Sequence, residues 1–117
     1  MGKPMAGHLI KAGHRLTVHN RSRGAVDELV AAGATAAATP AEVARASTVV
    51  ITMLPDTPDV ERVITAPDGI LSALQKGAIV IDMSSISPVA TEKLASPPRW
   101  PRPRRARPRR RGCGCER

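Results

Sequence analysis

The chain has 117 residues, enough for one small domain, and carries a formal net charge of +8. It contains no apolar run of about 18 residues and no basic start followed by a continuous apolar segment, so neither a transmembrane helix nor a secretory signal is expected. Both cysteines, Cys113 and Cys115, lie too close together for an unstrained disulfide, and a reducing, cytoplasmic location is expected.

The charge is distributed unevenly along the chain. Residues 1–95 contain nine Lys and Arg and nine Asp and Glu, whereas residues 96–117 contain nine Arg and one Glu. Recurrent prolines interrupt helix and strand in this last segment, and its like charges repel. We therefore expect a folded domain over residues 1–95 and a disordered Arg/Pro-rich tail over residues 96–117. The abrupt change after Ala95 also suggests the hypothesis that the tail is read out of frame.

Helical and extended patterns alternate along residues 1–95. The expected elements are helix 4–11, strand 15–19, helix 23–32, edge strand 35–38, helix 40–46, strand 49–53, helix 58–64, helix 70–75, strand 78–82 and helix 88–95. Gly13 and Gly33 end the first two helices, and Thr39-Pro40 begins the third. The last two strands are almost wholly apolar, which is typical of strands buried on both faces of a parallel sheet. Strands alternating with helices indicate an α/β fold with a doubly wound parallel sheet.

Four motifs in order resemble the β-hydroxyacid dehydrogenase family. They are Met1-Gly2-Lys3-Pro4-Met5-Ala6, Val18-His19-Asn20-Arg21-Ser22, Ile51-Thr52-Met53-Leu54-Pro55 and Ile81-Asp82-Met83-Ser84-Ser85-Ile86. The last motif is more similar to the 2-hydroxy-3-oxopropionate (tartronate semialdehyde) reductases than to the 3-hydroxyisobutyrate dehydrogenases. The resemblance implies a Rossmann-like, 6-phosphogluconate dehydrogenase-like domain. The parent enzyme would transfer hydride between a nicotinamide and a small hydroxy acid or its semialdehyde.

The same resemblance implies that parts of the parent enzyme are absent. The first motif matches only the second half of the family's glycine-rich fingerprint, so we expect a partial sheet without its first strand, weak cofactor binding and marginal stability. The substrate segment, catalytic lysine and helical second domain have no counterpart. Lys3, Lys11, Lys76 and Lys93 match none of the catalytic positions, so no catalytic residue is predicted and the chain is expected to be inactive.

The resemblance also implies the cofactor and its first contacts. Gly2 matches the last fingerprint glycine, beside the phosphates at a helix N-terminus; alternatively it is only a flexible terminal residue. Asn20, Arg21 and Ser22 stand where an acidic residue would bind the ribose of NAD. Asn20 does not repel a 2′-phosphate and Arg21 can pair with it, which favours NADP, with NAD as an alternative. The other interpretation is a solvated turn that caps the next helix.

The remaining predicted cofactor residues follow the last two strands. They are Met53, Leu54 and Pro55 along the cofactor and Ser85 near the nicotinamide ribose. An ordinary proline-terminated loop is the alternative for the first three. We expect Ser84 and Ser87 to act as helix caps rather than as cofactor ligands.

Other functions are less well supported by the sequence. His8, His14 and His19 lack the spacing of a metal cluster, so no metal site is predicted. The nine arginines of the tail offer an alternative function, nonspecific binding of nucleic acid or another acidic surface. A cofactor-binding module without catalysis is a third interpretation. The expected partner is the dinucleotide, with a small hydroxy acid only in the complete enzyme and no membrane.

Overall fold

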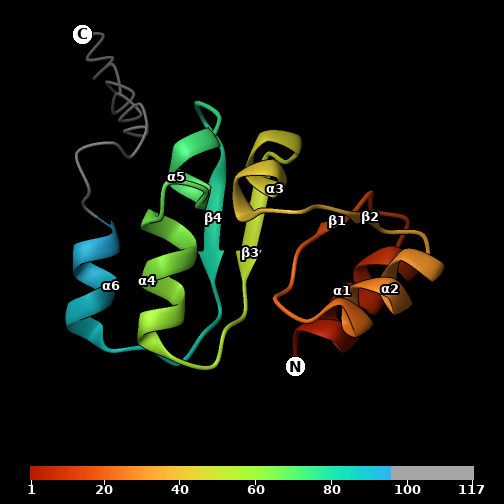
Figure 1. The fold of residues 1–117 in the computed structure, drawn as a ribbon, viewed down its shortest axis with the longest axis horizontal. Helices are drawn as coiled ribbons and strands as arrows, with labels where there is room; N and C mark the ends of the chain where they lie inside the picture. Colours follow the sequence, from red (N-terminus) through yellow and green to blue (C-terminus); the bar gives the residue numbers. More distant parts are fainter. Residues whose placement is uncertain (96–117) are drawn as a thin grey trace, which may run out of the picture.

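The computed structural model describes residues 1–95, in which helices and short parallel strands alternate (Figure 1). The elements are α1 (Gly2–Lys11), β1 (Thr17–Val18), α2 (Arg23–Ala31), β2 (Thr35–Ala36), α3 (Pro40–Ala46), β3 (Val49–Thr52), α4 (Thr57–Thr65), α5 (Ile70–Ala73), β4 (Ile79–Asp82) and α6 (Pro88–Ala95). Every predicted element is present, and the α/β class is confirmed. The predictions of disorder and polyanion binding for residues 96–117 lie outside the described residues.

Local signals explain where several helices begin and end. Gly13 and Gly33 follow α1 and α2 with φ of 86° and 108°, a backbone region that favours glycine. Before α3, the Thr39 Oγ1 accepts a hydrogen bond from the Glu42 N–H at 3.2 Å, and the Glu42 carboxylate accepts one from the Ala38 N–H at 2.7 Å. The first bond satisfies a backbone donor that the first turn of a helix leaves free, and the second ties Glu42 back to the residue before the N-cap.

The strands form two separate parallel pairs within residues 1–95. Thr17 lies opposite Thr35 in the β1–β2 pair, and Val49 to Thr52 lie opposite Ile79 to Asp82 in the β3–β4 pair. This arrangement agrees with the expected partial, doubly wound parallel sheet, whose two halves do not pair with each other among the described strands. Contacts of α3 with both β1 and β3 connect the two pairs.

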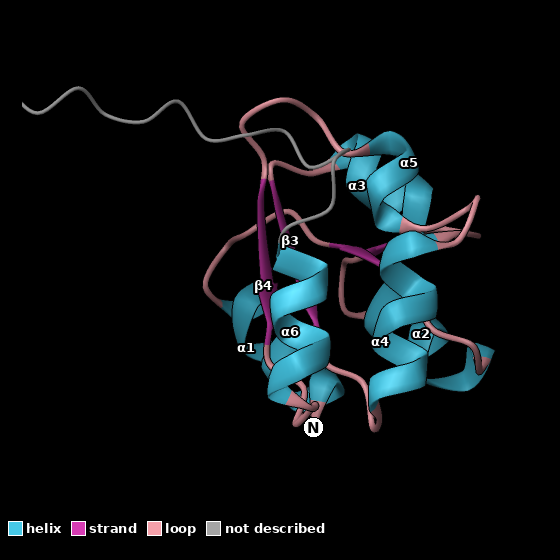
Figure 2. Ribbon diagram, turned by 90° about the vertical axis from the view of Figure 1, so that its left-hand side faces the viewer, coloured by secondary structure: helices cyan, strands magenta, loops and turns pink. Residues whose placement is uncertain are grey.

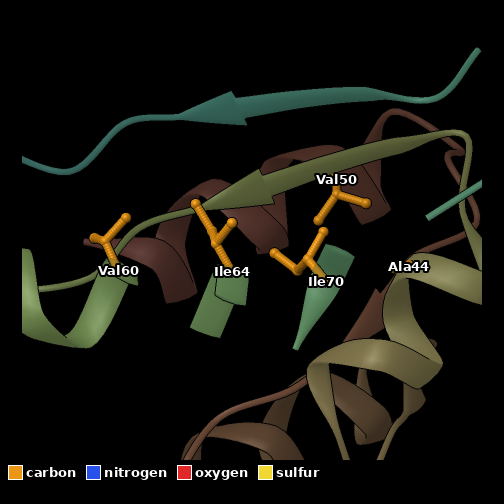
Figure 3. Packing of buried hydrophobic residues seen from close by; sticks show 5 residues of the cluster. All are labelled: Ala44, Val50, Val60, Ile64 and Ile70. Atoms are coloured by element: carbon orange, nitrogen blue, oxygen red, sulfur yellow. The ribbon is translucent and has the colours of Figure 1, made fainter. Parts of the chain in front are cut away.

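A cluster of buried aliphatic side chains lies between β3 and the helices beside it (Figure 3). It contains Ala44 of α3, Val50 of β3, Val60 and Ile64 of α4, and Ile70 of α5. In Figure 2, α3, α4 and α5 lie on the same side of the β3–β4 pair. The core therefore fixes one face of this pair against three helices.

The prediction that β3 and β4 are buried on both faces is wrong. Val50 is 3% exposed, but Val49 and Ile51 on the opposite face of β3 are 48% and 40% exposed. Ile79 and Ile81 of β4 are similarly exposed. The reason is that successive side chains of a strand point to opposite faces, and the helices packed in the core cover only one of them.

Candidate cofactor-binding site

The carboxyl ends of β3 and β4 lie at the edge where α1, α4 and α6 begin (Figure 1). Gly2, the first residue of α1, lies beside Met53, which directly follows β3: a Cβ built on Gly2 would be 3.7 Å from the Met53 Cβ. Two predicted site residues that are 51 positions apart in the sequence are thus adjacent. The first turn of α1 contains no acidic residue, and free N–H groups at a helix N-terminus attract anions.

A hydrogen-bond network connects the loops that follow β3 and β4. The Leu54 N–H donates to the Ser84 Oγ at 2.9 Å, and the Ser84 N–H donates to the Asp82 carboxylate at 3.1 Å. The same carboxylate oxygen accepts from the buried Thr52 hydroxyl at 2.8 Å. The prediction that Ser84 caps a helix is wrong, because its hydroxyl is used across the sheet edge to hold the Leu54 backbone.

The other residues of these loops differ in exposure. Met53 and Leu54 are half-buried, whereas Pro55 and Ser85 are exposed at the edge. Ser87 directly precedes α6, and its carbonyl accepts the first hydrogen bond of the helix, from the Thr91 N–H at 3.0 Å. Capping of α6 by the Ser87 side chain stays a prediction.

A separate hollow of about 400 Å³ follows the carboxyl end of β1. It is lined by His19, Asn20, Arg21, Arg23, Val26, Asp27, Ala36, Ala37 and Ala38. Two arginines against one carboxylate make the lining cationic. The three alanines come from β2 and the loop after it, and their small side chains leave room between that loop and α2.

The Asn20-Arg21-Ser22 turn is held by its own side chains. The Asn20 Nδ2 donates to the Ser22 Oγ at 3.2 Å. Ser22 occupies the N-cap position of α2, yet within the described residues its side chain makes no capping bond to the helix. The Ser22 hydroxyl is thus used within the turn rather than on the first N–H groups of α2.

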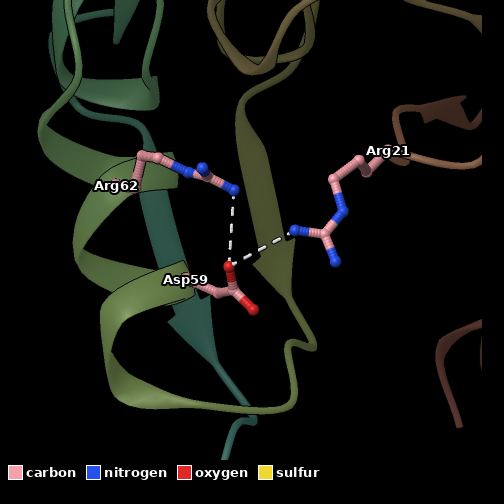
Figure 4. Close-up of polar contacts among 3 residues, drawn as sticks. All are labelled: Arg21, Asp59 and Arg62. Atoms are coloured by element: carbon pink, nitrogen blue, oxygen red, sulfur yellow. Dashed lines mark hydrogen bonds and ion pairs between the residues drawn. The ribbon is translucent and has the colours of Figure 1, made fainter.

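The structure adds two residues that the sequence analysis missed, Asp59 and Arg62 of α4 (Figure 4). The Arg21 Nη1 lies 3.9 Å from the Asp59 Oδ1, and the Arg62 Nη2 lies 3.4 Å from the same oxygen. In the sequence, Asp59 is an ordinary acidic residue of a helix first turn, so no local signal distinguishes it.

Residues 1–95 contain neither a group of metal-ligand side chains nor a helix that could cross a membrane. In this part of the chain no three His, Cys, Asp or Glu side chains gather as metal ligands would. Nor is any helix described here both long and apolar enough to cross a membrane.

Parallel strand–helix units with ligand-accessible loops at the strand carboxyl ends define a Rossmann-like dinucleotide-binding domain. Residues 1–98 match the family described as the NAD binding domain of 6-phosphogluconate dehydrogenase, and the chain belongs to this family. The β-hydroxyacid dehydrogenase resemblance is confirmed.

Individual relatives match the chain with similar strength. It is 45% identical over 96 residues to 2-hydroxy-3-oxopropionate reductase of Escherichia coli K12, a match covering 81% of this chain and 32% of that protein. It is also 45% identical over 94 residues to 3-sulfolactaldehyde reductase of the same organism, covering 80% and 32%. A solved structure of Psf3 in complex with NADP+ and 2-OPP matches with a TM-score of 0.75 and 32% identity, covering 80% of this chain and 34% of that one.

The chain thus spans about a third of the length of these relatives. Equal identity to two reductases with different substrates in their names does not separate one substrate from the other.

Proposed function

We propose that residues 1–95 bind a nicotinamide dinucleotide, with NADP preferred and NAD accepted as an alternative. The observation that carries this proposal is the cationic hollow after β1, where Asn20 stands in place of the acidic residue that binds the ribose hydroxyls of NAD. Arg21 and Arg23 line the same hollow and can form charge-assisted hydrogen bonds with a 2′-phosphate.

The rest of the cofactor would follow the edge formed by the strand ends. The start of α1 at Gly2 suits the pyrophosphate, because the free backbone N–H groups of a helix N-terminus favour anions. The contact between Gly2 and Met53 places this helix start beside the Met53-Leu54-Pro55 loop. Ser85, exposed on the neighbouring loop, is proposed to contact the nicotinamide ribose. The related structure with NADP+ supports this choice of cofactor.

The cofactor preference can be tested by isothermal titration of the full chain with NADP+ and NAD+. Arg21→Ala is expected to weaken NADP+ binding about tenfold, since a hydrogen bond between charged groups is worth about 1.5–3 kcal/mol, and to leave NAD+ binding nearly unchanged. Arg15→Ala is a matched control, because Arg15 is exposed and precedes β1 at its opposite end. Equal losses for both cofactors in Arg21→Ala, or no binding of either cofactor by the unaltered chain, would contradict the proposal.

We further propose that hydride transfer to a small semialdehyde belongs to longer proteins of this family, and that the 117-residue chain binds cofactor without turnover. Support comes from the family resemblance, in which none of Lys3, Lys11, Lys76 and Lys93 matches a catalytic position. The measurement is the absorbance of NADPH incubated with the chain and 2-hydroxy-3-oxopropionate. A steady loss of absorbance that depends on both the chain and the semialdehyde would refute the inactive assignment.

A further inference from the structure

We propose that Asp59 competes with the cofactor's 2′-phosphate for Arg21 and so sets how strongly NADP is preferred over NAD. The inference rests on the proposed function, in which Arg21 binds this phosphate, and adds a residue of α4 to a specificity site otherwise made by the β1–α2 turn.

The geometry places Arg21 between two anionic partners. Its backbone belongs to the turn after β1 that lines the cationic hollow, while its guanidinium lies beside β3 and faces Asp59 of α4 (Figure 4). There the Arg21 Nη1 lies 3.9 Å from the Asp59 Oδ1. A phosphate in the hollow and the carboxylate on α4 would therefore compete for one guanidinium.

The contact with Asp59 is weak enough to be exchanged. The Arg21 side chain is 80% exposed, and 3.9 Å is longer than a hydrogen bond. Exposed ion pairs of this kind contribute little because water screens them. A phosphate can instead accept two parallel N–H bonds from a guanidinium and carries more negative charge than a carboxylate. Arg21 is thus expected to turn to the phosphate when NADP binds.

Arg62 allows this exchange without leaving Asp59 uncompensated. The Arg62 Nη2 lies 3.4 Å from the same Asp59 oxygen, one helical turn along α4. Asp59 is 29% exposed, so its carboxylate is partly shielded from water and profits from a remaining cation. The carboxylate still holds Arg21 when the hollow is empty, and this competition lowers the affinity for NADP.

Asp59 is not required to begin its helix. Asp56 is the N-cap of α4, and its carboxylate accepts a hydrogen bond from the Thr57 N–H at 2.7 Å. Removal of the Asp59 charge should therefore cost α4 only the small, favourable interaction of an acid with a helix N-terminus. A change in cofactor selectivity can then be separated from a change in folding.

The test is titration of the full chain and its variants with NADP+ and NAD+. Asp59→Asn is expected to tighten NADP+ binding about two- to fivefold, the range of an exposed ion pair, with NAD+ binding unchanged. In an Arg21→Ala background the same substitution should no longer tighten NADP+ binding. Asp59→Ser, which should behave in the same way, serves as a second variant if the first one lowers the melting temperature.

Glu61→Gln provides the matched control, because it removes the same charge from an exposed position on the same helix. It should leave the ratio of NADP+ to NAD+ affinity unchanged. The inference is overturned if Asp59→Asn leaves NADP+ binding unchanged or weakens it, tightens both cofactors equally, or still tightens NADP+ binding when Arg21 is absent. If Arg21→Ala itself leaves NADP+ binding unchanged, the proposed function fails and the inference fails with it; if Arg21→Ala weakens NADP+ binding while Asp59→Asn does not tighten it, only the inference fails.

Discussion

Residues 1–38 and residues 39–95 are built from the same alternation of strand and helix, but they bury very different amounts of apolar surface. All five residues of the core cluster belong to the second region, whereas Val26 and Ala34 are the buried residues of the first. The strands of the first region are two residues long and those of the second are four. Alanine-rich segments on both sides of β2 offer little to bury, because an alanine side chain contributes one methyl group.

Because of this difference, we expect stability to depend mainly on residues 39–95 and cofactor selectivity to depend mainly on residues 1–38. The loops at Met53 and Ser84 follow the strands of the well-packed β3–β4 region. The cationic hollow at Arg21 instead adjoins the β1–β2 region, where few side chains are buried. A ligand that contacts both regions would stabilise the folded chain by mass action. The Arg21–Asp59 contact is one of the few polar links between the two regions in the described part of the chain.

The largest expected effect is the loss of a core side chain. Ile70→Ala should lower the free energy of unfolding by about 3 kcal/mol, since Ile70 is 2% exposed within the cluster and its removal leaves a cavity. Val26→Ala, in the first region, should cost about 1 kcal/mol. Urea denaturation followed by circular dichroism measures both, and equal losses would show that the two regions are packed equally well.

Glycine substitutions should have opposite signs in the two regions. A Cβ on Gly69 would lie 2.8 Å from the Val63 carbonyl oxygen and 2.9 Å from those of Ile64 and Ala66, so Gly69→Ala should cost about 2 kcal/mol. Gly24 is the second residue of α2 and has open space around it, so Gly24→Ala should stabilise the chain by about 0.5 kcal/mol. Melting temperatures of the two variants test the contrast; a stabilised Gly69→Ala would mean that the loop before α5 moves freely.

Helix caps should matter in one region and not in the other. Thr39→Ala should cost about 1 kcal/mol, because the Thr39 Oγ1 accepts the hydrogen bond that caps α3. Ser22→Ala should cost less than about 0.5 kcal/mol, because the Ser22 side chain makes no capping bond to α2 in the described structure. Chemical denaturation of the two variants measures this difference in the free energy of unfolding. A larger loss of stability in Ser22→Ala than in Thr39→Ala would contradict the prediction.

The smallest effect is expected on the open face of the β3–β4 pair. Ile79 is 57% exposed, so Ile79→Thr should change the free energy of unfolding by less than about 0.5 kcal/mol. Val50→Thr, on the covered face of β3, should cost more than about 1 kcal/mol, because it buries a hydroxyl among aliphatic groups. A large loss in Ile79→Thr would show that something covers this face in solution.

Much of the fold was predictable because its signals are local. Glycines with positive φ, the Thr39-Pro40 cap and the apolar runs each act over a few residues, and they place every helix and strand within about two residues of its observed ends. Burial of the strands was predicted wrongly, because an apolar run such as Val49 to Ile51 does not show how many of its faces a helix will cover.

The candidate site was likewise predictable in part: its local motifs could be identified from the sequence, but the contacts between them could not. The resemblance identified Gly2, the Asn20-Arg21-Ser22 turn and the Met53 loop as separate motifs, each tied to a strand end or a helix start. It did not predict that Gly2 contacts Met53, that Ser84 holds the Leu54 backbone, or that Asp59 faces Arg21. These contacts join residues about 30 to 50 positions apart, which pattern and propensity do not link.

The sequence alone therefore determined the class of fold, the family and the residue types offered to a dinucleotide, because each depends on short motifs and on their order. Only the tertiary structure decided which face of β3 and β4 is covered, where the cationic hollow lies, and which carboxylate competes for Arg21. The physical reason is that packing brings distant segments together, and the charges and cavities of a binding site are properties of that packing rather than of any one segment.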